Sequence, residues 1–394
     1  MTSRRHLLVT NDFPPKIGGI QNYLWELWRR LPAGTASVYA TPYRGAADFD
    51  ASQPFAVKRS TEPVLVPYPW LPRRVDRLAD QSSSELVILD PAIPLGAIGP
   101  ALEHPTAVVL HGAEVTIPGR IPALRIAMAR TLRASSLVIA AGGYPLSEAE
   151  RCAGRQLPSV VVPPGVDTER FKPLETKARL EARERYGVGP NDFLIASVNR
   201  LVPRKGMARL VKAVALTAGR LGRKPDSTPE SHTRQIRAVI AGTGRERRRL
   251  DRLIADFRSP VSLVGRISDD DVVELYGAAD LMVMPCNSRW WGLEQEGFGI
   301  AFLEAAAAGV PQIAGRSGGA HEAVEADKTG LILDDPDNIE DLAGAIEFFV
   351  DNPEERARMG RTARERAEQE FNYDKLAKRL AEAIETCDLK HPSA

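Results

Sequence analysis

Two glutamates in the last third of the chain have the type and spacing to bind a polar ligand. Glu296 and Glu304 stand at the ends of a glycine-containing run, with seven residues between them. Carboxylates accept hydrogen bonds from sugar hydroxyls, and the unpaired N–H groups at the start of a helix attract an anion. A sugar nucleotide carries both groups. In a helix the two carboxylates would be about two turns apart, so we expect them to have different tasks.

A cluster of cations follows the strand expected at 193–197. Arg200, Arg204 and Lys205 lie within the segment 199–206, and Gly206 ends it. Fixed guanidinium and ammonium groups can neutralise a leaving diphosphate without a metal ion. The plain alternative for the cations is a solvated basic turn. For the two glutamates it is a pair of solvated helix charges, with Glu304 as a partner for Arg200 or Lys205. Ligands bind at the carboxyl ends of strands in open α/β sheets, which favours the diphosphate, and we expect Arg204 at the surface.

Two further polar segments follow strands in the first half. The turn 11–21 contains Gly18 and Gly19 before an amphipathic helix, where backbone N–H groups can approach a phosphate. It lacks the Gly-x-Gly-x-x-Gly pattern of a dinucleotide site, so an oxidoreductase is disfavoured. His111 follows the run 107–110 and could bond a sugar or a leaving group, although a lone histidine is more often structural.

Apolar runs alternate with helical stretches along the whole chain, which indicates parallel strands joined by helices. The strands are expected at 6–10, 37–40, 86–89, 107–110, 137–140, 160–162, 193–197, 238–241, 261–264, 281–284 and 311–314. A Pro-Pro-Gly segment at 163–165 marks a hinge between two doubly wound halves. The polar segment 222–235 is expected to be an exposed loop, and 269–271 to begin a helix rather than to hold a metal.

Composition excludes several classes of protein. A chain of 394 residues can form two domains, and its net charge of +1 gives no argument for nucleic-acid binding. Three widely spaced cysteines favour neither disulfides nor a zinc site, which indicates a cytoplasmic protein. No run reaches the roughly 20 apolar residues that span a bilayer, and no signal peptide is expected. No obligate protein partner is indicated.

The pattern resembles the family 4 retaining glycosyltransferases of the GT-B fold. The likeness rests on Glu-x7-Glu at 296–304, Arg-x4-Lys-Gly at 200–206 and the turn after the first strand. Within that family the chain is most similar to the actinobacterial mannosyltransferases that use GDP-mannose to mannosylate a phosphatidylinositol mannoside. Those enzymes have His-Gly-His-Glu where this chain has His111, Gly112, Ala113 and Glu114, a departure that affects the expected donor and acceptor.

The resemblance implies an α/β fold with two Rossmann-like domains and a cleft between them. It places an acceptor-binding domain at 1–170, a nucleotide-sugar-binding domain at 171–370, a helix at 371–387 that returns to the first domain, and a frayed tail at 388–394. It implies that Glu296 meets hydroxyls of the donated sugar and that Glu304 meets the ribose. The other implied donor contacts are Gly18, Gly19, Arg200, Lys205, Val264, Arg266, Gly299 and Ile300. A second donor loop at 317–322 ranks below these.

The implied acceptor contacts are Asp12 and Gln21, and the implied catalytic residues are His111, Arg200, Lys205 and Glu296. We expect transfer of a hexose with retention, without a metal ion or other cofactor. A glycolipid acceptor would require peripheral contact with the inner face of the cell membrane. The candidates for that contact, which could equally pack inside, are Trp25, Trp28, Arg29, Arg30, Trp70, Arg73 and Arg74.

Alternatives remain open at this stage. Enzymes of the same fold use UDP- or ADP-sugars to make disaccharides, trehalose-like products or capsular glycans, and a sugar-nucleotide epimerase is more distant. A non-catalytic nucleotide-sugar-binding protein is a third possibility. It is disfavoured because a chain kept only for binding would not need the cation pair, the glutamate pair and His111 together.

Overall fold

The computed structural model describes residues 4–222, 235–289, 294 and 296–389. The chain forms two compact units, the first made of Met1–Gly165 with Tyr373–Ala394 and the second of Val166–Asn372. The sequence placed the corresponding boundaries at 170 and 371. No helix among the described residues is long and apolar enough to cross a membrane.

A parallel sheet of seven strands forms the centre of the first unit, in the order β3-β2-β1-β4-β5-β6-β7. The strand order changes direction between β1 and β4, so their carboxyl ends lie at a topological switch point. The strands are β1 (His6–Thr10), β2 (Ala36–Ala40), β3 (Ala56–Arg59), β4 (Leu86–Asp90), β5 (Thr106–Leu110), β6 (Leu137–Ala140) and β7 (Ser159–Val161).

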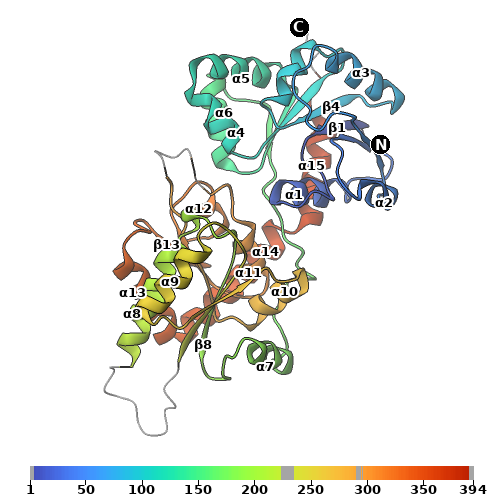
Figure 1. Cartoon of the computed structure of the whole chain (residues 1–394). Helices are drawn as coiled ribbons and strands as arrows, with labels where there is room; N and C mark the ends of the chain where they lie inside the picture. The colour runs from blue at the N-terminus through green and yellow to red at the C-terminus, as the bar shows by residue number, and fades with distance from the viewer. Residues whose placement is uncertain (1–3, 223–234, 290–293, 295, 390–394) are drawn as a thin grey trace. The chain divides into compact units, whose positions relative to one another are not determined.

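Helices cover both faces of this sheet (Figure 1). Because side chains alternate along a strand, Leu7 and Val9 of β1 enter one core and Leu8 enters the other. The second core also takes residues of α1 (Gly19–Trp28) and α15 (Tyr373–Thr386), so the last helix packs in the first unit. The remaining helices are α2 (Ala46–Ala51), α3 (Leu71–Gln81), η1 (Leu95–Ala101), α4 (Ala113–Thr116), η2 (Pro118–Arg120), α5 (Pro122–Ala134) and α6 (Gly143–Ala153).

The second unit has a parallel sheet of six strands in the order β10-β9-β8-β11-β12-β13. Its order changes direction between β8 and β11. The strands are β8 (Phe193–Val198), β9 (Ile236–Ala241), β10 (Val261–Gly265), β11 (Leu281–Met284), β12 (Gln312–Gly315) and β13 (Gly330–Leu333). The predicted parallel, doubly wound architecture is therefore confirmed in both units.

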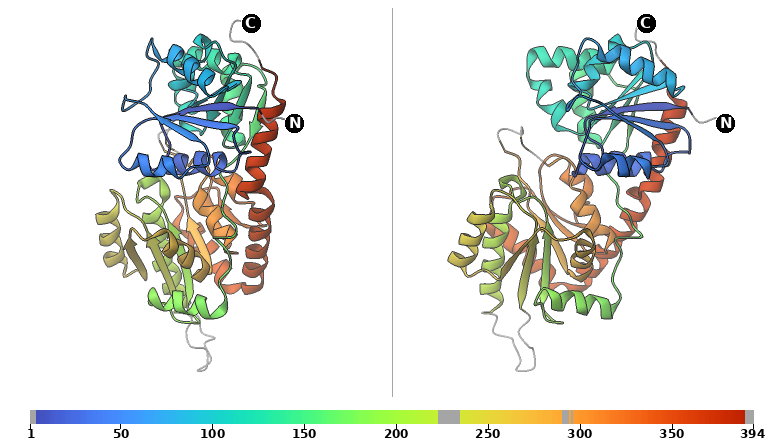
Figure 2. Two further views of the ribbon diagram at one scale, coloured as in Figure 1. Left: turned by 90° about the vertical axis from the view of Figure 1, so that its right-hand side faces the viewer. Right: turned by 45° about the vertical axis from the view of Figure 1, so that its right-hand side comes forward.

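The helices of the second unit pack against this sheet on both faces (Figure 2). They are α7 (Thr176–Arg185), η3 (Pro203–Lys205), α8 (Met207–Leu221), α9 (Arg247–Phe257), α10 (Asp269–Ala278), α11 (Ile300–Ala307), α12 (Ala320–Ala323), α13 (Ile339–Asp351) and α14 (Pro353–Glu370). Helix α10 begins with a capping box between Ser268 and Asp271. The acidic run 269–271 thus starts a helix, as predicted.

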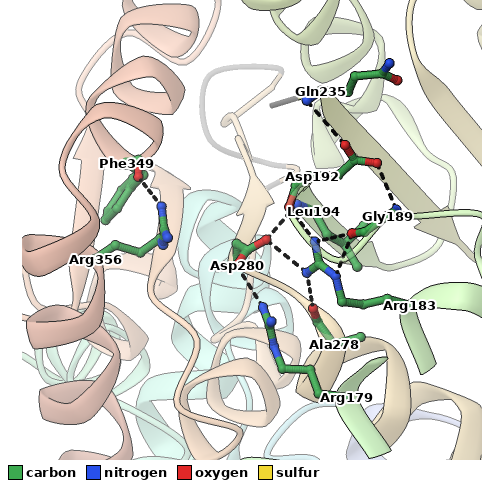
Figure 3. A network of polar contacts seen from close by, with 10 residues as sticks. All are labelled: Arg179, Arg183, Gly189, Asp192, Leu194, Gln235, Ala278, Asp280, Phe349 and Arg356. Carbon is green, nitrogen blue, oxygen red and sulfur yellow. Dashed lines mark hydrogen bonds and ion pairs between the residues drawn. The ribbon is translucent and has the colours of Figure 1, made fainter. Parts of the chain in front are cut away.

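A buried arginine holds together the amino-terminal side of the second sheet (Figure 3). Arg183 is 1% exposed, and its guanidinium donates to the carbonyls of Gly189, Asp192 and Ala278 and to the Asp280 carboxylate. Asp280 also accepts from the backbone N–H of Leu194 at 2.8 Å. A fully buried cation is tolerated only with such complete pairing. This network fixes the base of β8 and β11, away from the ends where a ligand would bind.

Two strands, β3 and β13, do not appear among those predicted from the sequence. Each is four residues long and lies at an edge of its sheet. The expected loop at 222–235 lies outside the described residues except for its two end positions.

Candidate functional site

An ion pair joins the loops that follow β8 and β11 in the second unit. Lys205 Nζ lies 2.8 Å from Glu296 Oε2, and both side chains are about nine-tenths buried. The two residues are distant in sequence, but β8 and β11 are neighbours at the switch point of the sheet. The structure therefore brings together a cation predicted for the diphosphate and a carboxylate predicted for the sugar.

Backbone contacts hold Glu296 in place. Its N–H donates to Ser317 Oγ at 3.2 Å, and its carbonyl accepts from the N–H of Gly319 at 3.0 Å. Burial by itself would raise the pKa of the Glu296 carboxyl, but Lys205, Arg204 and Arg200 together lower the pKa below its usual value. Glu296 is thus an anion at neutral pH, ready to accept hydrogen bonds from hydroxyls.

Arg204 lies in this cluster, and the expectation that it is a surface residue was wrong. Its side chain is 16% exposed, with Nε 3.7 Å from Glu296 Oε2 and Nη1 3.9 Å from Glu294 Oε1. The short helix η3 turns Arg204 and Lys205 to the same side, which the linear spacing alone does not show. Arg200 is exposed and acts on the Glu296 carboxylate through its charge.

Gly206 lets the two loops approach each other closely. Its φ of +79° is in the left-handed region, and a Cβ there would lie 2.2 Å from the carbonyl oxygen of Pro285. The same residue caps α8. A side chain at this position would push Lys205 away from the loop that carries Glu296.

Glu304 lies in different surroundings from Glu296. It is within α11, and the charges that act on it are Asp269 and Arg170 rather than Arg200 or Lys205. Burial, with a contribution from Asp269, raises the pKa of Glu304 to about 7, and Arg170 opposes this rise. The alternative in which Glu304 pairs with Arg200 or Lys205 is therefore not what the structure shows, and the two glutamates have separate environments.

The other predicted nucleotide contacts lie at the same edge of the second sheet. Val264 and Arg266 are exposed at the carboxyl end of β10, the edge strand. Gly299 caps α11 and Ile300 is its first residue, directly after the loop that carries Glu296. Their positions at carboxyl strand ends and at a helix start fit the ligand-binding edge of an open sheet.

In the first unit, a hydrogen-bonded chain crosses the carboxyl ends of three adjacent strands. Thr10 ends β1, Asp90 ends β4 and His111 follows β5. Asp90 accepts from Thr10 Oγ1 at 2.5 Å through one oxygen, and its other oxygen lies 2.5 Å from His111 Nε2. The backbone N–H of His111 is also bonded to the Glu114 carboxylate.

The buried Asp90 carboxylate sets the state of the imidazole. Burial by itself would lower the pKa of His111, but Asp90, Glu114 and Asp12 together raise the pKa above its usual value. A proton on Nε2 satisfies Asp90, and no hydrogen bond joins Nδ1 to another described residue. Nδ1 is therefore the ring atom that can bond a ligand.

The turn before α1 places the predicted acceptor contacts against each other. Asp12 Oδ1 accepts from Gln21 Nε2 at 2.5 Å and from Lys16 Nζ at 2.7 Å. Gln21 is buried and covers Gly18, where a Cβ would lie 2.1 Å from Gln21 Oε1. Gly18 caps α1 and Gly19 is its first residue, so backbone N–H groups at this turn remain suited to a phosphate.

Comparison with known proteins decides the family. Residues 17–170 match the model described as Glycosyltransferase Family 4, and residues 178–366 match Glycosyl transferases group 1. A GDP-mannose-dependent alpha-(1-6)-phosphatidylinositol monomannoside mannosyltransferase of Mycobacterium tuberculosis is 35% identical over 96% of this chain and 98% of that protein. The chain is a family 4 glycosyltransferase.

Other relatives agree with this assignment. The monoacylated phosphatidylinositol monomannoside mannosyltransferase of Corynebacterium glutamicum is 31% identical over 98% of both chains. Among solved structures, Anabaena Alr3699/HepE in complex with UDP has a TM-score of 0.78 at 21% identity over 96% of this chain and 99% of that one. WaaG, involved in lipopolysaccharide biosynthesis, has a TM-score of 0.66 at 18% identity over 97% of this chain and all of that one. The fold of this glycosyltransferase is GT-B, as predicted.

Sequence reasoning missed Asp90 and Thr10 in the glycosyltransferase. Both are fully buried polar residues at the ends of apolar strands. A carboxylate at the end of a fully apolar run can be recognised in the sequence as a residue that needs a partner, because a buried carboxylate must be paired. Its partner His111 is far along the chain, so the pair becomes visible only when β4 and β5 lie side by side.

The tryptophans predicted for membrane contact differ in exposure. Trp28 is 1% exposed and packs edge-on against His6, so the glycosyltransferase cannot use it at a membrane. Trp25 donates to Gln53 at 2.7 Å, and Arg30 is paired with Glu26 and Asp374. Trp70 is exposed and stacks on Tyr68 at 5.0 Å. Among the described residues, no cluster of histidine, cysteine and acidic side chains has the arrangement of a metal site.

Proposed function

We propose that this chain transfers mannose from GDP-mannose to a phosphatidylinositol mannoside, with retention of configuration. The observation that carries the proposal is its similarity, over nearly its whole length, to mannosyltransferases named for that donor and acceptor. The enzyme would work in the cytoplasm, at the inner face of the cell membrane, where a glycolipid headgroup is accessible.

In the reaction, the bond between the anomeric carbon and the diphosphate oxygen breaks. The acceptor hydroxyl oxygen forms its bond to that carbon on the same face and gives its proton to the departing diphosphate. Charge therefore builds up on the departing diphosphate. Lys205 has three donors, so it can stay bonded to Glu296 and also reach a diphosphate oxygen, and Arg200 adds a second cation. This arrangement requires no metal ion.

Glu296 and His111 are assigned to the transferred sugar. The anionic Glu296, held by its backbone at the loop after β11, accepts hydrogen bonds from sugar hydroxyls. Asp90 raises the pKa of His111 and holds its Nε2, so Nδ1 is the ring atom offered to a sugar hydroxyl. We assign the ribose to Glu304, the nucleotide to Val264, Arg266, Gly299 and Ile300, the phosphates to Gly18 and Gly19, and the acceptor to Asp12 and Gln21.

A thermal-shift screen against GDP, UDP, ADP and their sugar conjugates tests the donor. A ligand that binds the folded state raises the unfolding temperature. We expect GDP and GDP-mannose to stabilise the protein selectively. Stabilisation by a uridine or adenine nucleotide alone would reject GDP-mannose and move the function to another branch of the family.

Radiolabelled GDP-mannose with a detergent-dispersed phosphatidylinositol mannoside tests the acceptor. We expect label in the lipid phase, and far less label when Lys205→Ala replaces the wild type. Label only in water-soluble products would reject the glycolipid acceptor. Nucleotide binding without hydrolysis or transfer would instead support a non-catalytic nucleotide-sugar-binding protein.

A further inference from the structure

One continuous set of hydrogen bonds joins His111 to the turn 11–21 before α1, here called the acceptor turn. Thr10 is the link, because its hydroxyl donates to one oxygen of Asp90 at 2.5 Å and accepts from the backbone N–H of Asp12 at 2.8 Å. The other oxygen of Asp90 lies 2.5 Å from His111 Nε2. The set therefore runs from the imidazole through Asp90 and Thr10 to the backbone of the acceptor turn.

The side chain of Asp12 extends this set to the residues assigned to the acceptor. Its carboxylate accepts from Gln21 Nε2 at 2.5 Å and from Lys16 Nζ at 2.7 Å. Because the backbone N–H of Asp12 is bonded to Thr10, the position of the carboxylate depends on the end of β1. A shift of Thr10 would therefore move the contact between Asp12 and Gln21 as well.

Thr10 and Asp90 lie where water cannot replace these bonds. Both residues are 0% exposed, and they are cross-strand neighbours in the register of β1 and β4. Both oxygens of Asp90 are used, one by Thr10 and one by His111. Breaking any of these bonds would leave a buried polar atom without a partner, so the buried network favours a single arrangement.

Titratable groups from four elements face the ring of His111. Asp90 ends β4, Glu114 belongs to α4, Asp12 lies in the acceptor turn, and Tyr23 of α1 packs edge-on with its ring centroid at 5.6 Å. Burial by itself would lower the pKa of His111, and the three carboxylates raise the pKa above its usual value. Among the described residues, only Asp90 is hydrogen-bonded to the ring. Asp90 therefore sets the orientation of the imidazole and the nitrogen that is left for a ligand.

We propose that Asp90 and Thr10 are positioning residues for mannosyl transfer, which set the His111 imidazole and the acceptor turn relative to each other. The proposal rests on the proposed function, because it takes His111 as a contact of the transferred sugar and Asp12 with Gln21 as contacts of the acceptor. Neither Asp90 nor Thr10 has to touch a substrate. They keep contact groups from separate elements in one geometry.

A second buried Asp–His pair in the same unit provides a comparison. Asp76 Oδ1 lies 2.9 Å from His104 Nδ1 and accepts from the backbone N–H of Glu103 at 3.1 Å. His104 precedes β5, whereas His111 follows it, so the two pairs lie at opposite ends of that strand. The same substitution in each pair therefore separates a positioning role from a role in stability alone.

The first test observes the imidazole directly in the full chain. Proton–nitrogen NMR correlation spectra show which ring nitrogen carries the proton, and His111→Gln identifies the His111 signal among six histidines. We expect the neutral ring of the wild type to carry its proton on Nε2. Asp90→Asn should change this signal and lower the pKa of His111, because burial is then no longer opposed by the charge of Asp90. An unchanged signal in folded Asp90→Asn would overturn the proposal.

The second test measures transfer from GDP-mannose to a detergent-dispersed phosphatidylinositol mannoside, per folded molecule. Asp90→Asn should lower kcat about tenfold or more, and Thr10→Val should lower kcat and raise KM for the acceptor by similar factors, because a small misplacement of a contact group is costly. Thr10→Ser keeps the hydroxyl and should restore nearly wild-type kinetics. The controls are Asp76→Asn and Thr106→Val, a buried threonine that begins β5, and both should affect stability only.

Two kinetic results would overturn the proposal. One is wild-type kcat and KM in Thr10→Val. The other is an equal loss of kcat in Asp76→Asn and Asp90→Asn, which would reduce both pairs to a role in stability. Thermal unfolding checks the fold of every variant, and the Thr10 variants decide the proposal where Asp90→Asn does not fold.

The two tests also separate this inference from the proposed function. Absent mannosyl transfer in the wild type would reject the proposed function, whereas the NMR signal of His111 in Asp90→Asn would still show whether Asp90 orients the imidazole. Normal transfer in the wild type, with the same kinetics in Asp90→Asn and Thr10→Val, would reject the positioning role alone.

Discussion

The contact between Lys205 and Glu296 is the central feature of the candidate site in the second unit. A buried ammonium lies 2.8 Å from a buried carboxylate, and its charge favours the ionised form of Glu296. Each group nevertheless has bonding capacity left, since an ammonium has three donors and a carboxylate about four acceptor positions. The pair can therefore hold its geometry while it binds a ligand with both hydroxyls and phosphates.

Replacing either predicted diphosphate ligand tests this assignment. Lys205→Ala or Arg200→Ala should lower kcat for mannosyl transfer roughly a hundredfold or more, because the variant loses a cation that stabilises charge on the departing diphosphate. Single-turnover transfer measures the effect. The control is Arg248→Ala, an exposed arginine on α9. Unchanged turnover in either variant would remove that residue from the site.

A stability measurement must accompany the Lys205 variant, because it leaves the buried Glu296 carboxylate without its partner. The pKa of Glu296 is lowered in the folded state, so the stabilisation from this pair is present at neutral pH and is lost as the pH falls through that lowered pKa. Activity is therefore compared at neutral pH, below the unfolding temperature of the variant.

Glu304 gives a pH dependence of the opposite sign. Its usual pKa of 4.5 is raised to about 7 in the folded protein, so the folded state holds a proton that the unfolded state loses. The free energy of unfolding should therefore fall as the pH rises from about 4.5 through about 7, by up to about 3 kcal/mol. Glu304→Gln should abolish this fall.

Urea unfolding at pH 5 and pH 8 measures the difference between Glu304→Gln and the wild type. We expect the variant to gain stability relative to the wild type on going from pH 5 to pH 8. Glu322→Gln, a replacement of the same kind on α12, serves as the control. An equal effect of Glu304→Gln at both pH values would show that burial does not raise the pKa of Glu304.

At the scale of the elements, strand order determines which loops can meet. The loops after β8 and β11 carry Lys205 and Glu296, and the ends of β1, β4 and β5 carry Thr10, Asp90 and His111. In both sheets these strands are at or beside the switch point, where adjacent connections leave on opposite faces and leave space for a ligand. The polar residues of both units are therefore positioned by the topology of the sheets.

Two glycines at α8 allow two effects of a glycine-to-alanine change to be compared. One is a clash where two loops approach closely, and the other is the ordinary gain in helix propensity. Gly206→Ala should destabilise the protein by a few kcal/mol and impair transfer, since its φ is +79° and a Cβ would lie 2.2 Å from the Pro285 carbonyl. Gly219→Ala, within the helix and with no atom within 4 Å of the added Cβ, should stabilise by about 0.5–1 kcal/mol. Thermal unfolding and single-turnover transfer measure both variants. Equal stability changes in the two would reject the close approach of the loops.

At the scale of the whole molecule, we predict that the cations assigned to the ligand offset its charge and that no metal ion is required. The diphosphate carries two or three negative charges, and Arg200, Arg204 and Lys205 lie around the Glu296 carboxylate. Added EDTA should therefore leave the rate of mannosyl transfer unchanged. The transfer assay with and without chelator, and with Mg²⁺ restored, measures this. A large loss of rate on chelation that Mg²⁺ restores would reject metal independence.

The amino-acid sequence by itself determined the parallel sheets and their main strands, and it indicated most residues of the candidate site in the second unit. Apolar runs of strand length identify buried parallel strands, and Arg200, Lys205 and Glu296 stand in a local pattern of fixed spacing. The edge strands β3 and β13 were not predicted, because short strands that pair on one side only have weak apolar sequence patterns.

Only the tertiary structure decided which distant residues touch. It paired His111 with Asp90, turned Arg204 toward Glu296 and buried Trp28. The physical reason is that local pattern reports the secondary structure and the polarity of each segment. Partners and burial depend on strand order and helix packing, which join residues that lie tens or hundreds of positions apart.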